Sequence, residues 1–181
     1  MNPSDNEILD RLDALIQETT AIRDLIANRK KTELVSKPKI RPKIQPKTVE
    51  LIGYFDGASR GNPGPAGLGA VIKDASGQIL ETRADYIGDK ATNNVAEYNG
   101  LIAVLELAKK HHGTDVTIYG DSELVIKQIN DKYQVKKEHL KDLHKQAKGL
   151  IANFPKIEIV HVKRDQNQEA DQLSNEAIDN K

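Results

Sequence analysis

Residues from about Ser4 to Asn28 carry apolar side chains at helical spacing. Ser4 and Glu7 form a capping-box pair, which marks the start of a helix. Large apolar residues then alternate at intervals of four and three, with Thr19 counted in the series: Ile8, Leu12, Leu15, Ile22 and Ile26. This spacing predicts a helix with a heptad seam of about three repeats. Two roles remain open, a coiled-coil helix that oligomerises the chain and an amphipathic helix that folds back on its own domain.

The apolar pattern ends in residues 29–48, where prolines recur every four residues and basic side chains dominate. The prolines are Pro38, Pro42 and Pro46, and the only acid in this segment is Glu33. The basic residues include Lys30, Lys31, Lys37, Lys39, Arg41, Lys43 and Lys47. Such a segment has no apolar face to bury, so it predicts an extended, polyproline-like linker. The linker is either a solvated spacer or an additional contact to substrate phosphates.

From Val49 onward, the periods of strands and of amphipathic helices alternate. Strands are predicted over residues 49–56, 69–72, 79–82, 116–119 and 156–162, and helices over 92–111, 122–130, 137–153 and about 170–178. The order βββ-α-β-α-α-β-α predicts an α/β fold, a five-stranded mixed sheet flanked by helices. The chain is therefore expected to comprise an N-terminal helix (1–28), a basic linker (29–48) and a globular domain that would carry any catalytic site (49–181).

Composition and charge exclude several classes of protein. Among 181 residues, 27 Lys and Arg balance 27 Asp and Glu, so any nucleic-acid binding would depend on local charge arrangement. The chain has no cysteine, which excludes disulfides and thiolate zinc sites. No apolar run approaches the roughly 18 residues of a membrane span, and no signal-peptide pattern follows Met1. We therefore expect a soluble, cytoplasmic protein.

Four acidic residues stand where folding alone gives little reason for them. Asp56 and Asp121 end two predicted strands, and Glu97 and Asp171 lie in the first turns of two predicted helices. Adjacent parallel strands would bring the first two acids to one sheet edge, where such folds bind ligands. Oxygen ligands without histidine or cysteine favour Mg²⁺ or Mn²⁺. Each acid alone also has an ordinary interpretation as a turn residue, a helix cap or a charge at a helix N-terminus.

The segments around these acids resemble those of type 1 ribonuclease H. Four motifs occur in the order typical of that family: YFDGASRGNPG (54–64), TNNVAEY (92–98), GDSELV (120–125) and NQEADQL (167–173). The resemblance covers residues of about 50 to 178. It implies a metal-dependent endoribonuclease that cuts the RNA strand of RNA–DNA hybrids, leaving 5′-phosphate and 3′-hydroxyl ends. It also implies that Asp56, Glu97, Asp121 and Asp171 are catalytic ligands of two Mg²⁺ or Mn²⁺ ions.

The same resemblance implies a set of substrate contacts. Backbone around Ser59 and Gly61, together with Glu97, would meet RNA 2′-hydroxyls, which distinguish RNA from DNA. Thr92 would contact a phosphate of the DNA strand. Three asparagines would line the groove between the strands, and Glu123 would add a further contact. The asparagines are Asn62, Asn93 and Asn94, and each could instead form a turn or cap a helix.

Two departures from the family pattern indicate its compact bacterial and archaeal branch. Ile129 runs through a short segment into the next helix, so there is no room for a basic helical protrusion. Residues 162–167 are too short for a mobile histidine loop, and His161 fits strand alternation. Arg164 is a candidate accessory residue for phosphate contact or product release. The alternative function is a non-catalytic nucleic-acid-binding or assembly module that retains the fold. Double-stranded RNA is a second possible partner.

Overall fold

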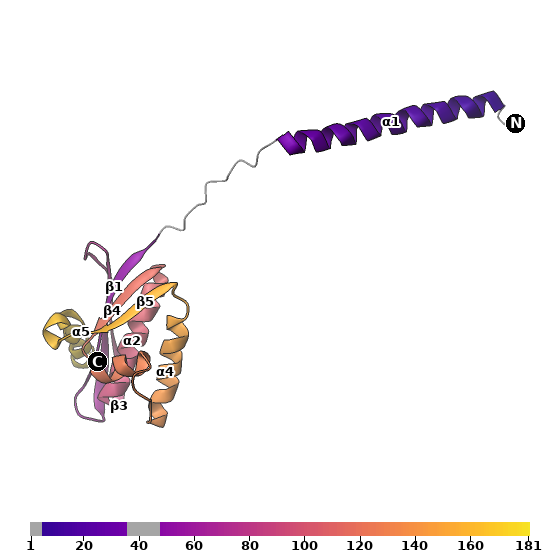
Figure 1. The fold of residues 1–181 in the computed structure, drawn as a ribbon. Coiled ribbons are helices and arrows are strands. Elements are labelled where there is room, and N and C mark those ends of the chain that lie inside the picture. The colour runs from indigo at the N-terminus through magenta and orange to yellow at the C-terminus, as the bar shows by residue number, and fades with distance from the viewer. Residues whose placement is uncertain (1–4, 36–47) are drawn as a thin grey trace. The chain divides into compact units, whose positions relative to one another are not determined.

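A computed structural model of the chain describes residues 5–35 and 48–181, which fall in two compact units, 1–46 and 47–181. In the first unit the described element is the helix α1 (Asp5–Val35). The second unit contains the sheet and the other helices (Figure 1). In the part of the chain that the structure describes, no helix is long and apolar enough to cross a membrane.

The helix α1 continues beyond the end that the apolar pattern indicates. It passes Asn28 and ends at Val35, so residues 29–35, assigned to the linker, are helical. These residues include no proline or glycine, and Arg, Lys, Glu and Leu are good helix formers. Basic charge therefore does not end the helix. The remainder of the predicted linker before Val49, residues 36–47, and the predicted cap Ser4 lie outside the described residues.

The second unit is built on a five-stranded mixed sheet with the order β3-β2-β1-β4-β5. Its strands are β1 (Glu50–Ser59), β2 (Gly64–Asp74), β3 (Ile79–Ala91), β4 (Asp115–Gly120) and β5 (Lys156–His161). The first three form an antiparallel meander, whereas β4 pairs in parallel with both β1 and β5. The predicted fold class and strand count are confirmed. Phe55 lies opposite Gly120 in the parallel pair, so the residues that follow them emerge at one sheet edge.

Helices cover both faces of this sheet. The elements are α2 (Asn93–Lys110), α3 (Glu123–Ile129), α4 (Glu138–Ile151), a short 3₁₀ turn η1 (Arg164–Gln166) and α5 (Gln168–Asp179). Figure 1 shows α5 on the opposite side of the sheet from α2 and α4. The main core lies where α2 meets the sheet, with Phe55, Leu101, Leu105 and Ile118 fully buried. This packing fixes the N-terminus of α2 against the end of β1.

Two strands of the meander, β2 and β3, are longer than the sequence patterns indicate. The sequence predicted strands over residues 69–72 and 79–82. In the structure the pairing of β2 with β3 extends from Gly64 opposite Ala91 to Lys73 opposite Ile79. β3 is an edge strand whose side chains are mostly exposed or half-buried, so its sequence lacks the apolar alternation of a central strand. Backbone pairing with β2, rather than side-chain burial, gives β3 its length.

Candidate active site

Three of the four predicted acids form one group in the structure. Asp56 is near the end of β1, Asp121 follows β4, and Glu97 lies in the second turn of α2. Each contributes a carboxylate oxygen, and these three oxygens all lie within 4.8 Å of one another. The parallel pairing of β1 and β4 accounts for two of them, because Asp56 and Asp121 directly follow the paired residues Phe55 and Gly120.

Glu97 joins this group because α2 approaches β1 without an intervening side chain. A Cβ at Gly57 would lie 2.1 Å from the backbone of Ala96 and Glu97. A Cβ at Gly100, one turn along α2, would lie 2.4 Å from the carbonyl oxygen of Asp56. Both distances are far below van der Waals contact, so only glycine permits this packing. The two glycines thereby bring the start of α2 close enough for Glu97 to reach the strand ends.

Asp56 and Glu97 are held in surroundings that disfavour their charge. The pKa of Asp56 is raised to about 6, mainly by burial and also by the nearby charges of Asp121 and Asp171, against a hydrogen bond from Ser174 that lowers it. Burial also raises the pKa of Glu97 well above its usual value, with added repulsion from Asp56 and Asp121. A bound cation would remove this penalty, because it stabilises the ionised form of every carboxylate around it.

The donor set fits a hard divalent cation. The second carboxylate oxygen of Glu97, Oε2, is buried and has no hydrogen-bond partner among the described residues. A buried polar atom without a partner is costly, and a metal–oxygen bond is one way to satisfy it. The three residues offer only oxygen atoms, which Mg²⁺ and Mn²⁺ prefer. Asp56, Glu97 and Asp121 therefore form a candidate metal centre.

Asp171, the fourth predicted acid, lies outside the group of three. It sits in the first turn of α5 and accepts a hydrogen bond from the guanidinium of Arg164. Asp171 is still close enough to raise the pKa of Asp56 through charge repulsion. The arginine that the sequence marked only as a possible accessory residue is thus the charge partner of this acid. Arg164 also lies near the group of three, since its positive charge lowers the pKa of Glu97.

Two residues that sequence reasoning missed hold the strand-end acids in place. Asn167 is 1% exposed, and its Nδ2 donates to the carbonyl oxygen of Phe55 (2.8 Å) and to Oδ1 of Asp121 (3.0 Å). Ser174 is fully buried, and its hydroxyl donates to Oδ2 of Asp56. The only sequence signal was their position, four residues before and three residues after Asp171.

The residues proposed from the resemblance to contact substrate come together from two segments. Ser59 donates to the carbonyl oxygen of Ala91 (3.0 Å), and the backbone N–H of Asn93 donates to Oδ1 of Asn62 (3.2 Å). The turn after β1 therefore lies against the start of α2. Gly61 has φ of 115°, a conformation that favours glycine and fixes the shape of this turn.

The start of α2 links the turn after β1 to the candidate metal centre. Thr92 caps the helix by accepting from the backbone N–H of Val95 (3.4 Å), and Asn94 is half-buried in the first turn. Asn93 is exposed, and its Nδ2 lies 3.4 Å from Oε1 of Glu97. Capping and substrate contact are compatible, because the cap uses only part of each polar group. Glu123 begins α3 and pairs with Lys127 (2.6 Å), which is not one of the predicted substrate-contact residues.

The second unit contains the residues that match a known protein family. Residues 54–177 match the family model described as reverse transcriptase-like. The ribonuclease HI of Halobacterium salinarum is 45% identical over 126 residues, which are 70% of this chain and 63% of that protein. The crystallised RNase H1 of the same archaeon is 42% identical, with a TM-score of 0.70 over 73% of this chain and 99% of that one.

The chain belongs to the type 1 ribonuclease H family. Another structural relative is LC11-RNase H1, solved in complex with an RNA/DNA hybrid. It is 40% identical, with a TM-score of 0.68 over 72% of this chain and 97% of that one. The bifunctional protein Rv2228c of Mycobacterium tuberculosis is 44% identical over 72% of this chain but only 36% of its own length. The chain thus spans less than two thirds of the length of the Halobacterium ribonuclease HI and of Rv2228c. The helix α1 lies outside the family match.

The ribonuclease H fold of this chain has the two short connections that its sequence indicates. Between β4 and β5 the described elements are α3 and α4 alone, joined through residues 130–137. Between β5 and α5 the chain makes only the turn η1. The short connection between β5 and Asp171 therefore contains Arg164 and Asn167 and has no extended loop. His161 is exposed at the end of β5, where it pairs with Gly120.

Proposed function

We propose that this ribonuclease H is an endonuclease that hydrolyses the RNA strand of RNA–DNA hybrids. The observation that carries the proposal is the group formed by buried Asp56, buried Glu97 and half-buried Asp121, in which Oε2 of Glu97 has no hydrogen-bond partner among the described residues. These carboxylates come from distant parts of the chain and meet where the fold places ligands. Holding three mutually repelling acids together, two of them buried, contributes nothing to folding by itself.

The reaction would use two divalent metal ions, Mg²⁺ or Mn²⁺. Asp56, Glu97, Asp121 and Asp171 would hold them, the last after exchanging its bond with Arg164 for a metal bond. When bound, the ions supply Lewis-acid activation of water and charge stabilisation at the scissile phosphate, which leaves 5′-phosphate and 3′-hydroxyl ends. Asn167 keeps Asp121 oriented by its hydrogen bond, and Ser174 does the same for Asp56.

Substrate would lie across the surface made by the turn after β1 and the start of α2. Ser59, Gly61 and Glu97 would meet RNA 2′-hydroxyls, which would select the RNA strand for cleavage. Asn62, Asn93 and Asn94 would reach into the minor groove, and Thr92 would contact the DNA strand. Glu123 stays a further proposed contact. Arg164 would contact the cleaved phosphate once it leaves Asp171.

A cleavage assay tests the proposal. Labelled RNA–DNA hybrid should be cut with Mg²⁺ or Mn²⁺ and left intact with a chelator. Asp121→Asn should abolish cutting, because it removes one of the three clustered carboxylates and leaves an amide of similar shape. Asp165→Asn is the matched control, since Asp165 is an exposed acid in η1, and it should cut like the parent. Circular dichroism should show both variants folded.

The outcome also separates the alternatives. Equal cutting by Asp121→Asn and the parent would refute the metal assignment. Tight binding of hybrid without any cutting would favour a non-catalytic module that retains the fold. A substrate panel of hybrid, double-stranded RNA, single-stranded RNA and DNA would then define the strictness of the enzyme. We expect hybrid to be the best substrate of the four.

A further inference from the structure

The helix α1 presents an apolar stripe of a kind that soluble proteins rarely leave uncovered. Eight of its large apolar side chains are between 44% and 70% exposed. They are Ile8, Leu9, Leu12, Leu15, Ile16, Ile22, Leu25 and Ile26. Contiguous apolar surface of this extent marks an interaction site. The family match covers residues 54–177, so it assigns no role to this helix.

The stripe follows a heptad register over three repeats. Ile8, Leu15 and Ile22 occupy the d positions, and Leu12, Thr19 and Ile26 occupy the a positions. Thr19 is the single polar residue in this seam. Its hydroxyl donates to the carbonyl oxygens of Leu15 and Ile16, both at 2.9 Å. The hydroxyl is therefore satisfied within the helix, and Thr19 can enter an apolar interface without leaving a donor unpaired.

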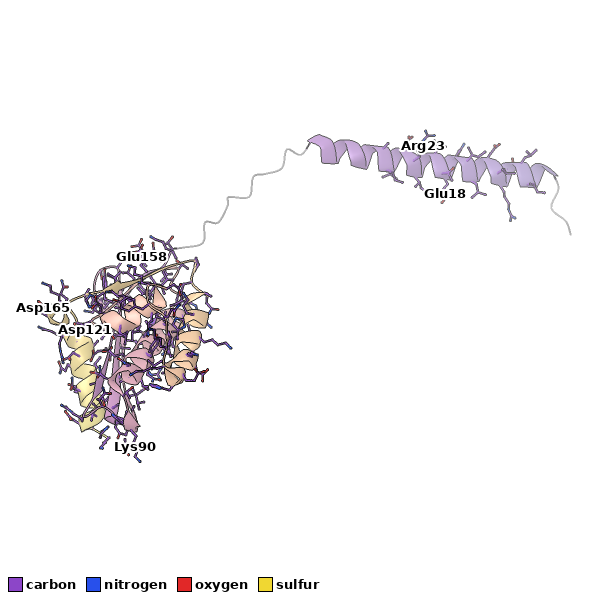
Figure 2. The ribbon with its side chains drawn as sticks, turned by 60° about the horizontal axis from the view of Figure 1, so that its bottom comes forward. Glu18, Arg23, Lys90, Asp121, Glu158 and Asp165 are labelled. Carbon is purple, nitrogen blue, oxygen red and sulfur yellow. The ribbon has the colours of Figure 1, made fainter. Side chains whose placement is uncertain are left out.

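The charges that flank the seam favour a parallel arrangement of two such helices. Glu18 is at a g position and Arg23 at the following e position, and Figure 2 shows them on opposite edges of α1. In a parallel pair, each Glu18 lies beside Arg23 of the other helix. An antiparallel pair with the same core would place Ile8 opposite Ile26 and bring the two Glu18 side chains together. Opposite charges meet in the first arrangement and like charges in the second.

The described surface of the second unit offers no matching stripe. Its exposed large apolar residues are Ile79, Leu80, Leu124 and Tyr133. The first two lie at the start of β3, the third on α3 and the fourth in the following loop, so they do not form a continuous row of three heptads. A second copy of α1, by contrast, carries an identical seam. We propose that α1 associates in parallel with α1 of a second copy of the chain, forming a coiled-coil dimer.

Sedimentation equilibrium of the full chain tests the association directly. The parent should reach a mass of twice 20.1 kDa as its concentration rises. Leu15→Lys, which places a charge in the seam, should remain monomeric. Gln17→Lys places the same charge on the outer face at an f position, and it should associate like the parent. A parent that stays monomeric at every concentration, or a Gln17→Lys variant that fails like Leu15→Lys, would overturn the proposal.

Single cysteines test the parallel orientation, because the chain has none of its own. Ile8→Cys should form a disulfide-linked dimer under mild oxidation, and so should Ile26→Cys. In an antiparallel pair of Ile8→Cys chains the two introduced thiols would be about 27 Å apart, because about 18 residues at about 1.5 Å each would separate them. Cross-linking only in a mixture of the two variants would therefore overturn the parallel arrangement. Neither result depends on catalysis.

A parallel dimer has a consequence that rests on the proposed function. Both catalytic units would be tethered at the same end of the coil, so one long hybrid could engage both at once, which raises avidity. Leu15→Lys should then bind a long hybrid at least tenfold more weakly than Gln17→Lys does, with equal cleavage of a short hybrid by both. Equal affinity for the long hybrid would refute this consequence. A failure of cleavage itself would leave the mass and cross-linking results unchanged.

Discussion

At the scale of single residues, the site combines the clustered acids with residues that hold these acids in position. Asp56 and Asp121 are each oriented by one hydrogen-bond donor, Ser174 and Asn167 respectively. Asn167 also donates to the backbone of Phe55, so one buried amide ties the end of β1 to the residue after β4. Donors of this kind fix the ligand geometry before any metal arrives. The stability of the fold therefore offsets the free energy needed to hold these repelling acids close together.

The raised pKa of Asp56 predicts how the stability of the protein depends on pH and metal. Between its ordinary value of 3.8 and about 6, the folded state keeps a proton that the unfolded state has lost. The contribution of Asp56 to the free energy of unfolding of metal-free protein therefore falls as pH rises from about 4 to about 6. Glu97 acts in the same direction. A metal that binds only ionised carboxylates restores stability at higher pH.

Thermal unfolding with and without Mn²⁺ or Mg²⁺ measures this effect. The metal should raise Tm clearly near pH 7 and little near pH 5, because protons compete for the ligands at the lower pH. Asp56→Asn removes one titrating ligand and should reduce the metal-induced rise near pH 7. An equal rise at both pH values would show that the metal does not bind these carboxylates.

At the scale of elements, the approach of α2 to β1 sets the position of Glu97. The contact depends on two glycines, and one of them, Gly100, lies within the helix. Glycine inside a helix costs about 0.5–1 kcal/mol relative to alanine, so its use here is explained by packing. The sequence showed a helix with a glycine in its interior, but not which strand the helix would meet.

Two alanine substitutions in two helices separate packing from helix propensity. Gly100→Ala should destabilise the protein by about 1–3 kcal/mol, because its Cβ would lie 2.4 Å from the carbonyl oxygen of Asp56. Cleavage should fall with it, since Asp56 or α2 must move. Gly149→Ala, in α4 with nothing within 4 Å of the new Cβ, should stabilise by about 0.5–1 kcal/mol with unchanged cleavage. Chemical denaturation measures both, and a harmless Gly100→Ala would contradict the close-packing argument.

Sequence patterns predicted which helices and strands form better than they predicted the residues at which these elements begin and end. The helix pattern around Leu101 and Leu105 and the alternation in β1 reflect burial on one face, which a sequence displays directly. The edge strand β3 has no such burial pattern, and the apolar heptad spacing in the sequence stops at Ile26, before the last turns of α1. The sequence therefore predicted both elements too short. Similarly, Asn167 and Ser174 are ordinary polar residues until the fold brings them against Asp121 and Asp56.

At the scale of the whole molecule, the chain joins a ribonuclease H unit to a helix through a basic segment. The net charge of the chain is zero, yet the predicted linker from residue 29 to 47 carries a strong excess of Lys and Arg. Such a local excess attracts phosphates even in a neutral protein. Contact between this segment and substrate phosphates is therefore a prediction from the sequence, with a spacer role as the alternative.

Salt dependence of binding tests the linker. Replacing Lys37, Lys39, Arg41 and Lys43 with glutamine should leave cleavage at saturating hybrid unchanged and weaken binding. The slope of log affinity against log salt should decrease by about 0.9 for each phosphate that the segment no longer neutralises. As a control, glutamine at Lys109 and Lys110, at the far end of α2 from Glu97, should leave the slope unchanged. An identical slope for the linker variant would assign the segment a spacer role alone.

The sequence by itself determined the fold class and the family, and it singled out four acids as candidate ligands, because burial periodicity and local motifs can be read along the chain. Only the tertiary structure decided which acids meet and what supports them. Asp56, Glu97 and Asp121 converge because β1 and β4 pair in parallel and α2 packs on glycine, whereas Asp171 is bound to Arg164. Distances between residues far apart in the chain depend on strand register and helix packing, and neither is visible in a local pattern.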